Sequence, residues 1–181
     1  SGFLACDPRI VESPRRIKAL SYKELRELSY MGANVLHSES IFPVRKANIP
    51  IHILNTFRPE DDGTLILPSV YYTHSGSIVT GIAGKKDFTV IFIEKSLMNA
   101  QIGFVRKVLS VLEKYGVPVE HIPSGIDTMS VVVESAALKD GKLELILQDI
   151  KQAVQPYTLR VNEDIALIST FGHGMSSSVV N

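Results

Sequence analysis

The feature that most constrains this chain is an alternation of apolar runs and amphipathic segments that begins after residue 63. Four short runs are rich in β-branched or aromatic residues and predict strands, at residues 88–93, 117–122, 129–133 and 157–161. Two longer segments, residues 104–115 and 142–154, repeat apolar side chains at helical spacing. The order βαββαβ is that of the ferredoxin-like motif, a four-stranded antiparallel sheet with both helices on one face. We therefore predict an α+β fold, which by itself identifies no function.

Residues 1–63 have a different pattern and predict a separate region of helical segments with one strand. Ser21 and Glu24 have the spacing of a capping box, which predicts the start of a helix. The expected elements are two helices and one buried strand, at about residues 22–31, 39–47 and 49–54. The turn-rich stretch RPEDDG, which ends at Gly63, predicts the boundary of this region.

An internal repeat predicts how the rest of the chain is divided. DFTVIFIEKSLM (Asp87–Met98) and DIALISTFGHGM (Asp164–Met175) share a first Asp, an apolar strand and a final Met, at an offset of 77 residues. We therefore expect one domain over residues 64–163 and the start of a second over residues 164–181. The second copy lacks about one helix and one strand, either because the chain is truncated or because a loop is left out of the sequence.

Composition and charge argue against several classes of function. Nineteen basic and nineteen acidic residues cancel, and no apolar run approaches the roughly 20 residues of a membrane helix, so we expect neither nucleic acid nor a membrane as partner. The single Cys6 and the lack of a signal-peptide pattern predict a cytoplasmic protein. Five histidines show no paired-ligand spacing, so no metal site is expected.

The polar loop before the helix at residues 104–115 is the strongest candidate for a binding site. Unpaired amides and the positive end of a helix dipole attract a carboxylate, such as that of an amino acid. By pattern alone, an equally good interpretation is that Asn99 and Gln101 only cap the helix. Glu120, on the next predicted strand, either faces the ammonium group of a ligand or lies on the solvent side. Taken alone, Asp7 and Arg9 predict a turn with an exposed charge pair.

Taken together, these residues resemble the aspartokinase family, whose members use ATP to phosphorylate the side-chain carboxylate of aspartate at the start of lysine, threonine and methionine synthesis. The resemblance runs through nearly the whole chain and rests on short phrases in the same order: GFLACDPRI, SYKELRELSYMGANVLH, NIPIHILNT, GTLI, IVTGIAGKKD and ALISTFGHGM. It implies that residues 1–63 are the C-terminal end of an amino-acid-kinase domain. Residues 64–163 and 164–181 would then be one ACT domain and the start of another, ACT domains being ferredoxin-like modules that bind amino-acid effectors.

The resemblance also implies a remnant of a nucleotide site at Asp7 and Arg9. ATP and Mg²⁺ would be bound by the parent enzyme, and no cofactor is expected on this chain alone. Leu4 stands where the family commonly has tyrosine, and Asn34 where it usually has lysine. Because the family's Phe-Gly-Gly-Thr-Ser motif is absent from the sequence, we expect no catalytic residues here and no phosphoryl transfer by this chain alone.

For regulation, the resemblance implies a site for a feedback inhibitor, lysine or threonine, and a homodimer formed through the ACT domains. The residues it assigns to the effector are Met98, Asn99, Gln101, Ile102, Gly103, Phe104, Glu120 and Ser130. Ligand binding at such a site shifts an equilibrium between two arrangements by binding one of them better. The rival interpretation is an ACT-type interaction module that only dimerises, without effector binding or kinase activity.

Overall fold

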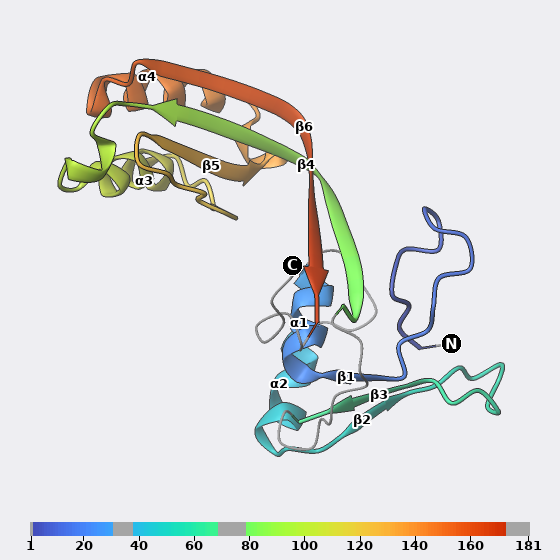
Figure 1. Ribbon diagram of the computed structural model, residues 1–181. Coiled ribbons are helices and arrows are strands. Elements are labelled where there is room, and N and C mark those ends of the chain that lie inside the picture. Colours follow the sequence, from blue (N-terminus) through green and yellow to red (C-terminus); the bar gives the residue numbers. More distant parts are fainter. Residues whose placement is uncertain (1, 31–37, 69–78, 173–181) are drawn as a thin grey trace, which may run out of the picture. The chain divides into compact units, whose positions relative to one another are not determined.

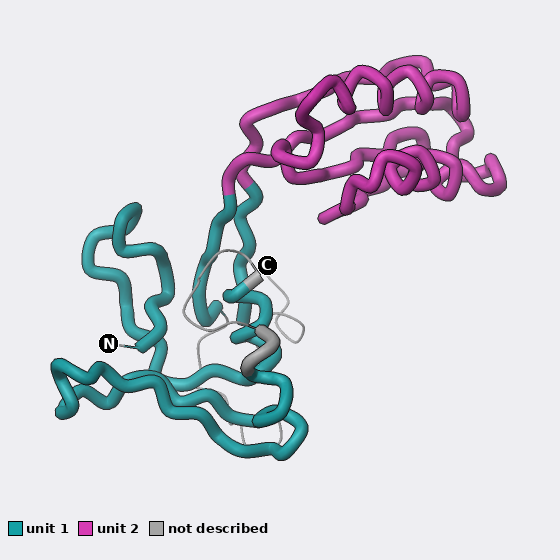
Figure 2. The backbone as a smooth tube through the Cα atoms, turned by 180° about the vertical axis from the view of Figure 1, so that it is seen from behind, with its two compact units in different colours: residues 1–85, 167–181 teal, residues 86–166 magenta. Residues whose placement is uncertain are grey.

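The computed structural model describes residues 2–30, 38–68 and 79–172 and divides the chain into two compact units (Figure 1, Figure 2). Unit 1 consists of residues 1–85 and 167–181, and unit 2 of residues 86–166. The chain passes between them within the long strands β4 (Gly81–Glu94) and β6 (Thr158–Phe171). Unit 2 is therefore an insertion into the sequence of unit 1.

Unit 2 is built on a sheet with the strand order β5-β4-β6. Figure 1 shows β6 beside β4 and running in the opposite direction. β4 pairs antiparallel with β5 in a continuous ladder, from Phe88 opposite Glu134 to Glu94 opposite Thr128. The other elements are η2 (Met98–Ala100), α3 (Phe104–Lys114), β5 (Thr128–Glu134), η3 (Ser135–Leu138) and α4 (Lys142–Val154).

The core of unit 2 lies between one face of this sheet and both helices. Every second residue from Ile91 to Ile93 in β4 and from Met129 to Val133 in β5 belongs to this core, as the twofold period of a strand requires. The buried side chains of this core include Ile91, Ile93, Val131 and Val133 of the sheet, Phe104, Val108 and Leu112 of α3, and Ile146, Ile150 and Val154 of α4. The predicted α+β fold with two helices on one face is thereby confirmed.

The strand predicted at residues 117–122 is wrong as a regular strand. This segment runs beside β5 and makes a single isolated bridge, between His121 and Val132. The amide of Glu120 donates to the Val132 carbonyl at 2.9 Å, and the Val132 amide donates to the His121 carbonyl at 2.9 Å. Pro118 has no N–H to give to a ladder, and prolines are confined to edges and interruptions of sheets for that reason. The segment is therefore an irregular edge.

Unit 1 contains a second small sheet with the order β1-β3-β2. The central strand, β3, is parallel to β1 and antiparallel to β2. The elements of unit 1 before β4 are β1 (Ala19–Ser21), α1 (Tyr22–Tyr30), α2 (Ser38–Lys46), β2 (Ile51–Ile53) and β3 (Thr64–Leu67). The predicted capping box is confirmed, since the Ser21 amide donates to Glu24 Oε2 at 2.8 Å and the Glu24 amide donates to Ser21 Oγ at 3.2 Å.

The structure places the end of unit 1 later than the boundary expected at Gly63. β3 begins at Thr64 and pairs with both neighbours in unit 1, so the chain has not left this unit there. The stretch expected to be a linker is the turn of a hairpin, in which the Arg58 amide donates to the Asn55 carbonyl and the Asp61 amide to the Arg58 carbonyl. Turn residues predict a reversal of the chain equally well whether it ends a domain or joins two paired strands.

The internal repeat corresponds to the two long strands that join the units. β6 (Thr158–Phe171) begins and ends 77 residues after β4 (Gly81–Glu94), which is the offset of the sequence repeat. Asp87 and Asp164 occupy the same place in the two strands, and both have left-handed backbone conformations, with φ of 69° and 56°. Asp164, the expected start of a second domain, therefore lies inside β6, and residues 173–181 of that expected domain lie outside the described residues.

Candidate functional site

The loop between β4 and α3 is held in place by the turn that precedes β5. The Leu97 amide donates to Asp127 Oδ1 at 2.7 Å, and the Lys95 amide donates to the Asp127 carbonyl at 2.8 Å. The Asn99 amide donates to the Ile126 carbonyl at 3.2 Å. The Lys95 ammonium group bonds to the Val154 carbonyl at the end of α4, where the helix dipole favours a cation. The loop is thus fixed at its base.

The start of α3 has no protein side chain that caps it within the described segment 79–172. Gly103 occupies the N-cap position with φ of 76°, a conformation that favours glycine, and it supplies no side chain. Of the two sequence interpretations for Asn99 and Gln101, capping of this helix is not what the structure shows. The Phe104 amide donates to the Gln101 backbone carbonyl at 3.2 Å. The rest of the first turn and the positive end of the helix dipole have no side-chain cap and can attract an anion.

A cationic side chain lies close to the same helix start. An ideal Cβ built on Gly103 would lie 3.8 Å from Arg106 Nε and 3.9 Å from Arg106 Nη2, so the guanidinium group lies beside the N-cap. No acidic residue is present in the first turn of α3. The local potential is therefore positive from both the backbone and the side chain.

The predicted loop residues divide into anchors and open positions. Met98 and Phe104 are 5% and 2% exposed and belong to the core of unit 2, so they hold the loop and are closed to a ligand. Asn99 is exposed, Gln101 is half-buried, and Ile102 is 97% exposed. Ile102 is thus among the most exposed large apolar side chains of the described residues.

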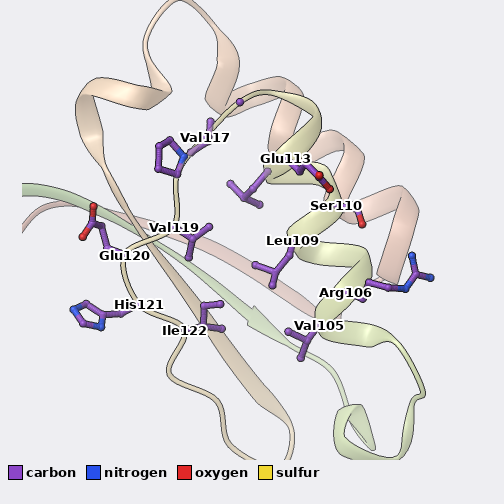
Figure 3. Close-up of a pocket in the computed structure, with 13 residues that line it drawn as sticks. Val105, Arg106, Leu109, Ser110, Glu113, Val117, Val119, Glu120, His121 and Ile122 are labelled. Carbon is purple, nitrogen blue, oxygen red and sulfur yellow. The ribbon is translucent and has the colours of Figure 1, made fainter.

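An open groove of about 1040 Å³ runs between α3 and residues 116–122 (Figure 3). Val105 and Leu109 of α3 form one wall, and Val119 and Ile122 are directed toward them in Figure 3. Its lining also includes the polar side chains of Arg106, Ser110, Glu113, Glu120 and His121. In Figure 3, Glu120 and His121 point away from α3, so Glu120 lies at the rim and not at the floor.

Ser130 lies apart from the helix start. Ser130 belongs to β5, where it is paired with Phe92 of β4. Its neighbours Met129 and Val131 have side chains that enter the core on the helix side of the sheet. Because strand side chains alternate, Ser130 is directed to the opposite face. The Ser130 amide donates to the Pro123 carbonyl at 2.8 Å. This bond connects β5 to the chain just after residues 116–122, which line the groove.

Sequence reasoning missed the wall of the groove. Val105 and Leu109 belong to the apolar repeat that predicted a helix at residues 104–115, yet Val105 is 40% exposed. The buried stripe of α3 instead uses Phe104, Val108, Val111 and Leu112. The sequence signal for this groove was the width of the apolar stripe on α3. The helix has more apolar residues around its circumference than can pack against the sheet.

Asp7 and Arg9 form an ion pair within one exposed turn of unit 1. Arg9 Nη2 donates to Asp7 Oδ2 at 2.7 Å, and Arg9 Nε donates to Asp7 Oδ1 at 3.0 Å. These hydrogen bonds lower the pKa of Asp7 from 3.8 to about 2. The Arg9 side chain is 86% exposed, so its guanidinium group remains reachable by a further anion.

The described ranges contain neither a cluster of metal-ligating side chains nor a membrane-spanning helix. Within residues 2–30, 38–68 and 79–172, no three His, Cys, Asp or Glu side chains gather where they could hold a metal ion. No helix in these ranges is both long enough and apolar enough to cross a bilayer.

Comparison with known proteins places these features in context. The model of the Amino acid kinase family matches residues 1–55. Aspartokinase 3 of Bacillus subtilis is 36% identical over 173 residues, which are 96% of this chain and 38% of that protein. The crystal structure of Clostridium acetobutylicum aspartate kinase is 54% identical with a TM-score of 0.91, and covers 98% of this chain and 41% of that one.

A more distant structure shares the fold. E. coli aspartokinase III in complex with lysine and aspartate, in its T-state, has a TM-score of 0.73 at 22% identity. The match covers 93% of this chain and 37% of that one. The chain therefore spans about two fifths of the length of the relatives it matches.

Proposed function

Because the chain belongs to the aspartokinase family, we propose that it is the regulatory part of an aspartate kinase with the C-terminal end of the kinase domain attached. The parent enzyme transfers the γ-phosphoryl group of Mg-ATP to the side-chain carboxylate of L-aspartate and forms 4-phospho-L-aspartate. This is the first step of lysine, threonine and methionine biosynthesis. The present chain binds an amino acid, lysine or threonine, as a feedback inhibitor.

The observation that carries this proposal is the open start of α3 beside the groove. The helix start without a side-chain cap and the Arg106 guanidinium group can bind the α-carboxylate of the effector. Val105 and Val119 offer apolar contact to its side chain. The complex of E. coli aspartokinase III with lysine makes lysine the first ligand to test.

The same surface supports dimerisation through the ACT domain of unit 2. Leu97, Ile102 and Ile126 are 72%, 97% and 70% exposed around the loop and its neighbouring turn. A second copy of the chain, placed along the irregular edge at residues 117–122, would cover these side chains and enclose an effector. The rival function, a module that dimerises but binds no effector, uses the same apolar surface and makes no use of the positive helix start.

The kinase remnant contributes to nucleotide binding in the parent enzyme under this proposal. Arg9 is exposed and held in one orientation by Asp7, which suits a guanidinium group that contacts phosphate oxygens. ATP and Mg²⁺ belong to the complete enzyme, and we expect no aspartate phosphorylation by the 181-residue chain. A cytoplasmic location remains part of the proposal.

Isothermal titration calorimetry of the chain with L-lysine, L-threonine and L-methionine tests the effector. We expect one of them to bind, and a Gly103→Asp variant to bind it at least about tenfold more weakly, because a carboxylate at the N-cap competes for the same amides and for Arg106. Gly103→Asn is the matched control, since Asn tolerates a positive φ and adds no charge.

Sedimentation of the same samples separates the two functions. Heat from one amino acid, lost in Gly103→Asp and kept in Gly103→Asn, supports the sensor. A dimer that gives no heat with any of the three amino acids supports the rival.

A further inference from the structure

One buried carboxylate is not used by the proposed effector site. Glu24 is 5% exposed, and its Oε2 accepts hydrogen bonds from the Ser21 amide at 2.8 Å and from Ser21 Oγ at 2.7 Å. The capping box accounts for these bonds. The second oxygen, Oε1, accepts from Thr80 Oγ1 at 2.7 Å, across 56 positions of the sequence. Capping does not explain this bond.

Thr80 stands immediately before β4, where the strand is held on several sides. Thr80 is 8% exposed, and its amide donates to the Phe171 carbonyl at 2.8 Å. The Ile82 amide donates to the Ala5 carbonyl at 2.7 Å. A Cβ on the intervening Gly81 would lie 2.5 Å from Phe171 Cζ and 3.0 Å from the Ala5 oxygen, so only glycine allows this approach. Ala5 lies two residues before Asp7, in the segment that presents Arg9.

The other end of β4 leads directly into the loop of the proposed effector site. Glu94 is the last residue of β4, and its carbonyl accepts from the Tyr157 amide at 2.8 Å. The antiparallel ladder from Phe88 to Glu94 joins β4 to β5. The loop base is therefore attached to a hydrogen-bonded part of β4, which is continuous in sequence with Thr80 and Ile82.

We propose that the Glu24–Thr80 hydrogen bond is a coupling contact that transmits effector binding from the loop after β4 to the Ala5–Arg9 segment. The inference rests on the proposed function, because it assumes an effector at the start of α3. The bond holds the start of β4 against α1, so that movement along β4 reaches Ala5 through the Ile82 amide. Glu24 and Thr80 are positioning residues in this scheme, and neither touches a ligand.

Cys6 can serve as a chemical probe of the Ala5–Arg9 segment, because it is the single cysteine of the chain and lies between Ala5 and Asp7. The rate at which an aromatic disulfide reagent labels Cys6 in the 181-residue chain reports local opening of this segment. L-lysine and L-threonine are the probes, each at a concentration that saturates binding in calorimetry. In the unaltered chain we expect the effector that binds to change the labelling rate about fivefold or more, the lower end of ordinary allosteric coupling.

The variants separate coupling from stability. Thr80→Val keeps the shape of the side chain and removes the donor to Glu24. It should bind the effector with an unchanged Kd but lose the effect of the effector on Cys6 labelling. Thr80→Ser keeps the hydroxyl group and should retain the effect. Ser21→Ala weakens the capping box without touching Oε1, so it controls for destabilisation of α1 and should also retain the effect.

Each outcome decides a different point. The coupling contact is refuted, and the effector site stands, if the effector binds to the unaltered chain without changing the rate of Cys6 labelling. The same conclusion follows if the effector changes the labelling rate as much in Thr80→Val as in Thr80→Ser. If Ser21→Ala loses the effect as fully as Thr80→Val, the contact is only structural. If neither amino acid gives heat in calorimetry, the proposed function fails first and the coupling fails with it.

Discussion

The starts of α1 and α3 solve the same physical problem in opposite ways. A helix leaves its first amides without partners inside the helix. At α1, Ser21 and Glu24 supply these partners from the chain itself, and both side chains are buried. At α3, Gly103 supplies none, and Arg106 adds positive charge. The first arrangement stabilises the fold. The second leaves a positive potential at the start of α3 that an anionic ligand can neutralise.

The start of α4 shows that an uncapped glycine is not sufficient. Gly141 has φ of 76°, the same as Gly103, and it also provides no side-chain cap. The first turn of α4, however, contains Glu144, which places a negative charge near the positive end of the dipole. α3 has no such residue and lies beside the groove. It is the combination of an open start, a cation and an apolar wall that distinguishes α3.

The closed start should be the more sensitive to loss of its side chain. Glu24→Ala removes acceptors from Ser21 and Thr80 in a buried setting, and we expect it to lower the free energy of unfolding by about 2–4 kcal/mol. Urea denaturation followed by circular dichroism measures the loss. Glu24→Gln, which keeps one carbonyl oxygen, should lose less than half as much. A loss below about 0.5 kcal/mol for Glu24→Ala would remove the contrast between the two helix starts.

The open start should respond in binding and not in stability. Arg106→Glu reverses the charge beside Gly103 and should weaken effector binding by about tenfold, equivalent to about 1.4 kcal/mol, while the midpoint of urea unfolding stays nearly unchanged. Arg106→Gln should weaken binding less, because it removes the cation without adding an anion. Calorimetry and urea denaturation on the same preparations test both statements. Equal binding by Arg106→Glu and the unaltered chain would exclude a carboxylate at this position.

The capping hydroxyl alone gives a smaller effect. Ser21→Ala should cost about 1 kcal/mol of unfolding free energy, the ordinary contribution of an N-cap side chain. Ser21→Asp, which restores an acceptor for the Glu24 amide, places two carboxylates together and should not recover the loss. Ser21→Thr keeps the hydroxyl group and should recover most of it. These three midpoints, measured in urea, show how much of the closed start depends on one oxygen atom.

The sequence predicted periodic elements well because their signals are local. α4 was expected at residues 142–154 and is found there, and the Ser21–Glu24 capping box marks the start of α1. Residues 117–122 were misjudged because an apolar run predicts burial, while a ladder also needs the amide that Pro118 lacks. Pattern reasoning found the elements and missed a condition on their pairing.

The extent of unit 1 and the groove are different, because both depend on partners far away in the sequence. β3 belongs to unit 1 because it pairs with β1 and β2, and a hairpin turn looks the same as a linker until that pairing is known. The loop before α3 could be found from its polar residues, but the groove could not. Val105 and Leu109 have the same period as the core, and only the packed structure shows that the sheet leaves them uncovered.

The far end of α3 completes the comparison, since it is closed by side chains where its start is open. Lys114 Nζ donates to Asp149 Oδ2 at 2.7 Å and Tyr115 Oη donates to the same oxygen at 2.9 Å, which ties α3 to α4. The hydrogen bond from Lys114, followed by that from Tyr115, lowers the pKa of Asp149 below 3.8. A lowered pKa means that the folded state holds the carboxylate ionised, so the stabilisation is present above pH 3.8 and is lost as the pH falls below it.

Asp149→Asn should therefore reduce the melting temperature at neutral pH by the smallest amount of the changes considered, because the Lys114–Asp149 ion pair is partly exposed and screened by salt. The difference between Asp149→Asn and the unaltered chain should shrink as the pH is lowered through 3.8 and below, where Asp149 itself becomes neutral. Thermal unfolding at several pH values provides the measurement, with Glu113→Gln on the same helix as a control for a general loss of negative charge. A difference that stays constant with pH would show that α3 is fixed by packing against α4. The charges at its far end would then contribute as little to the free energy of unfolding as those at its open start do without a ligand.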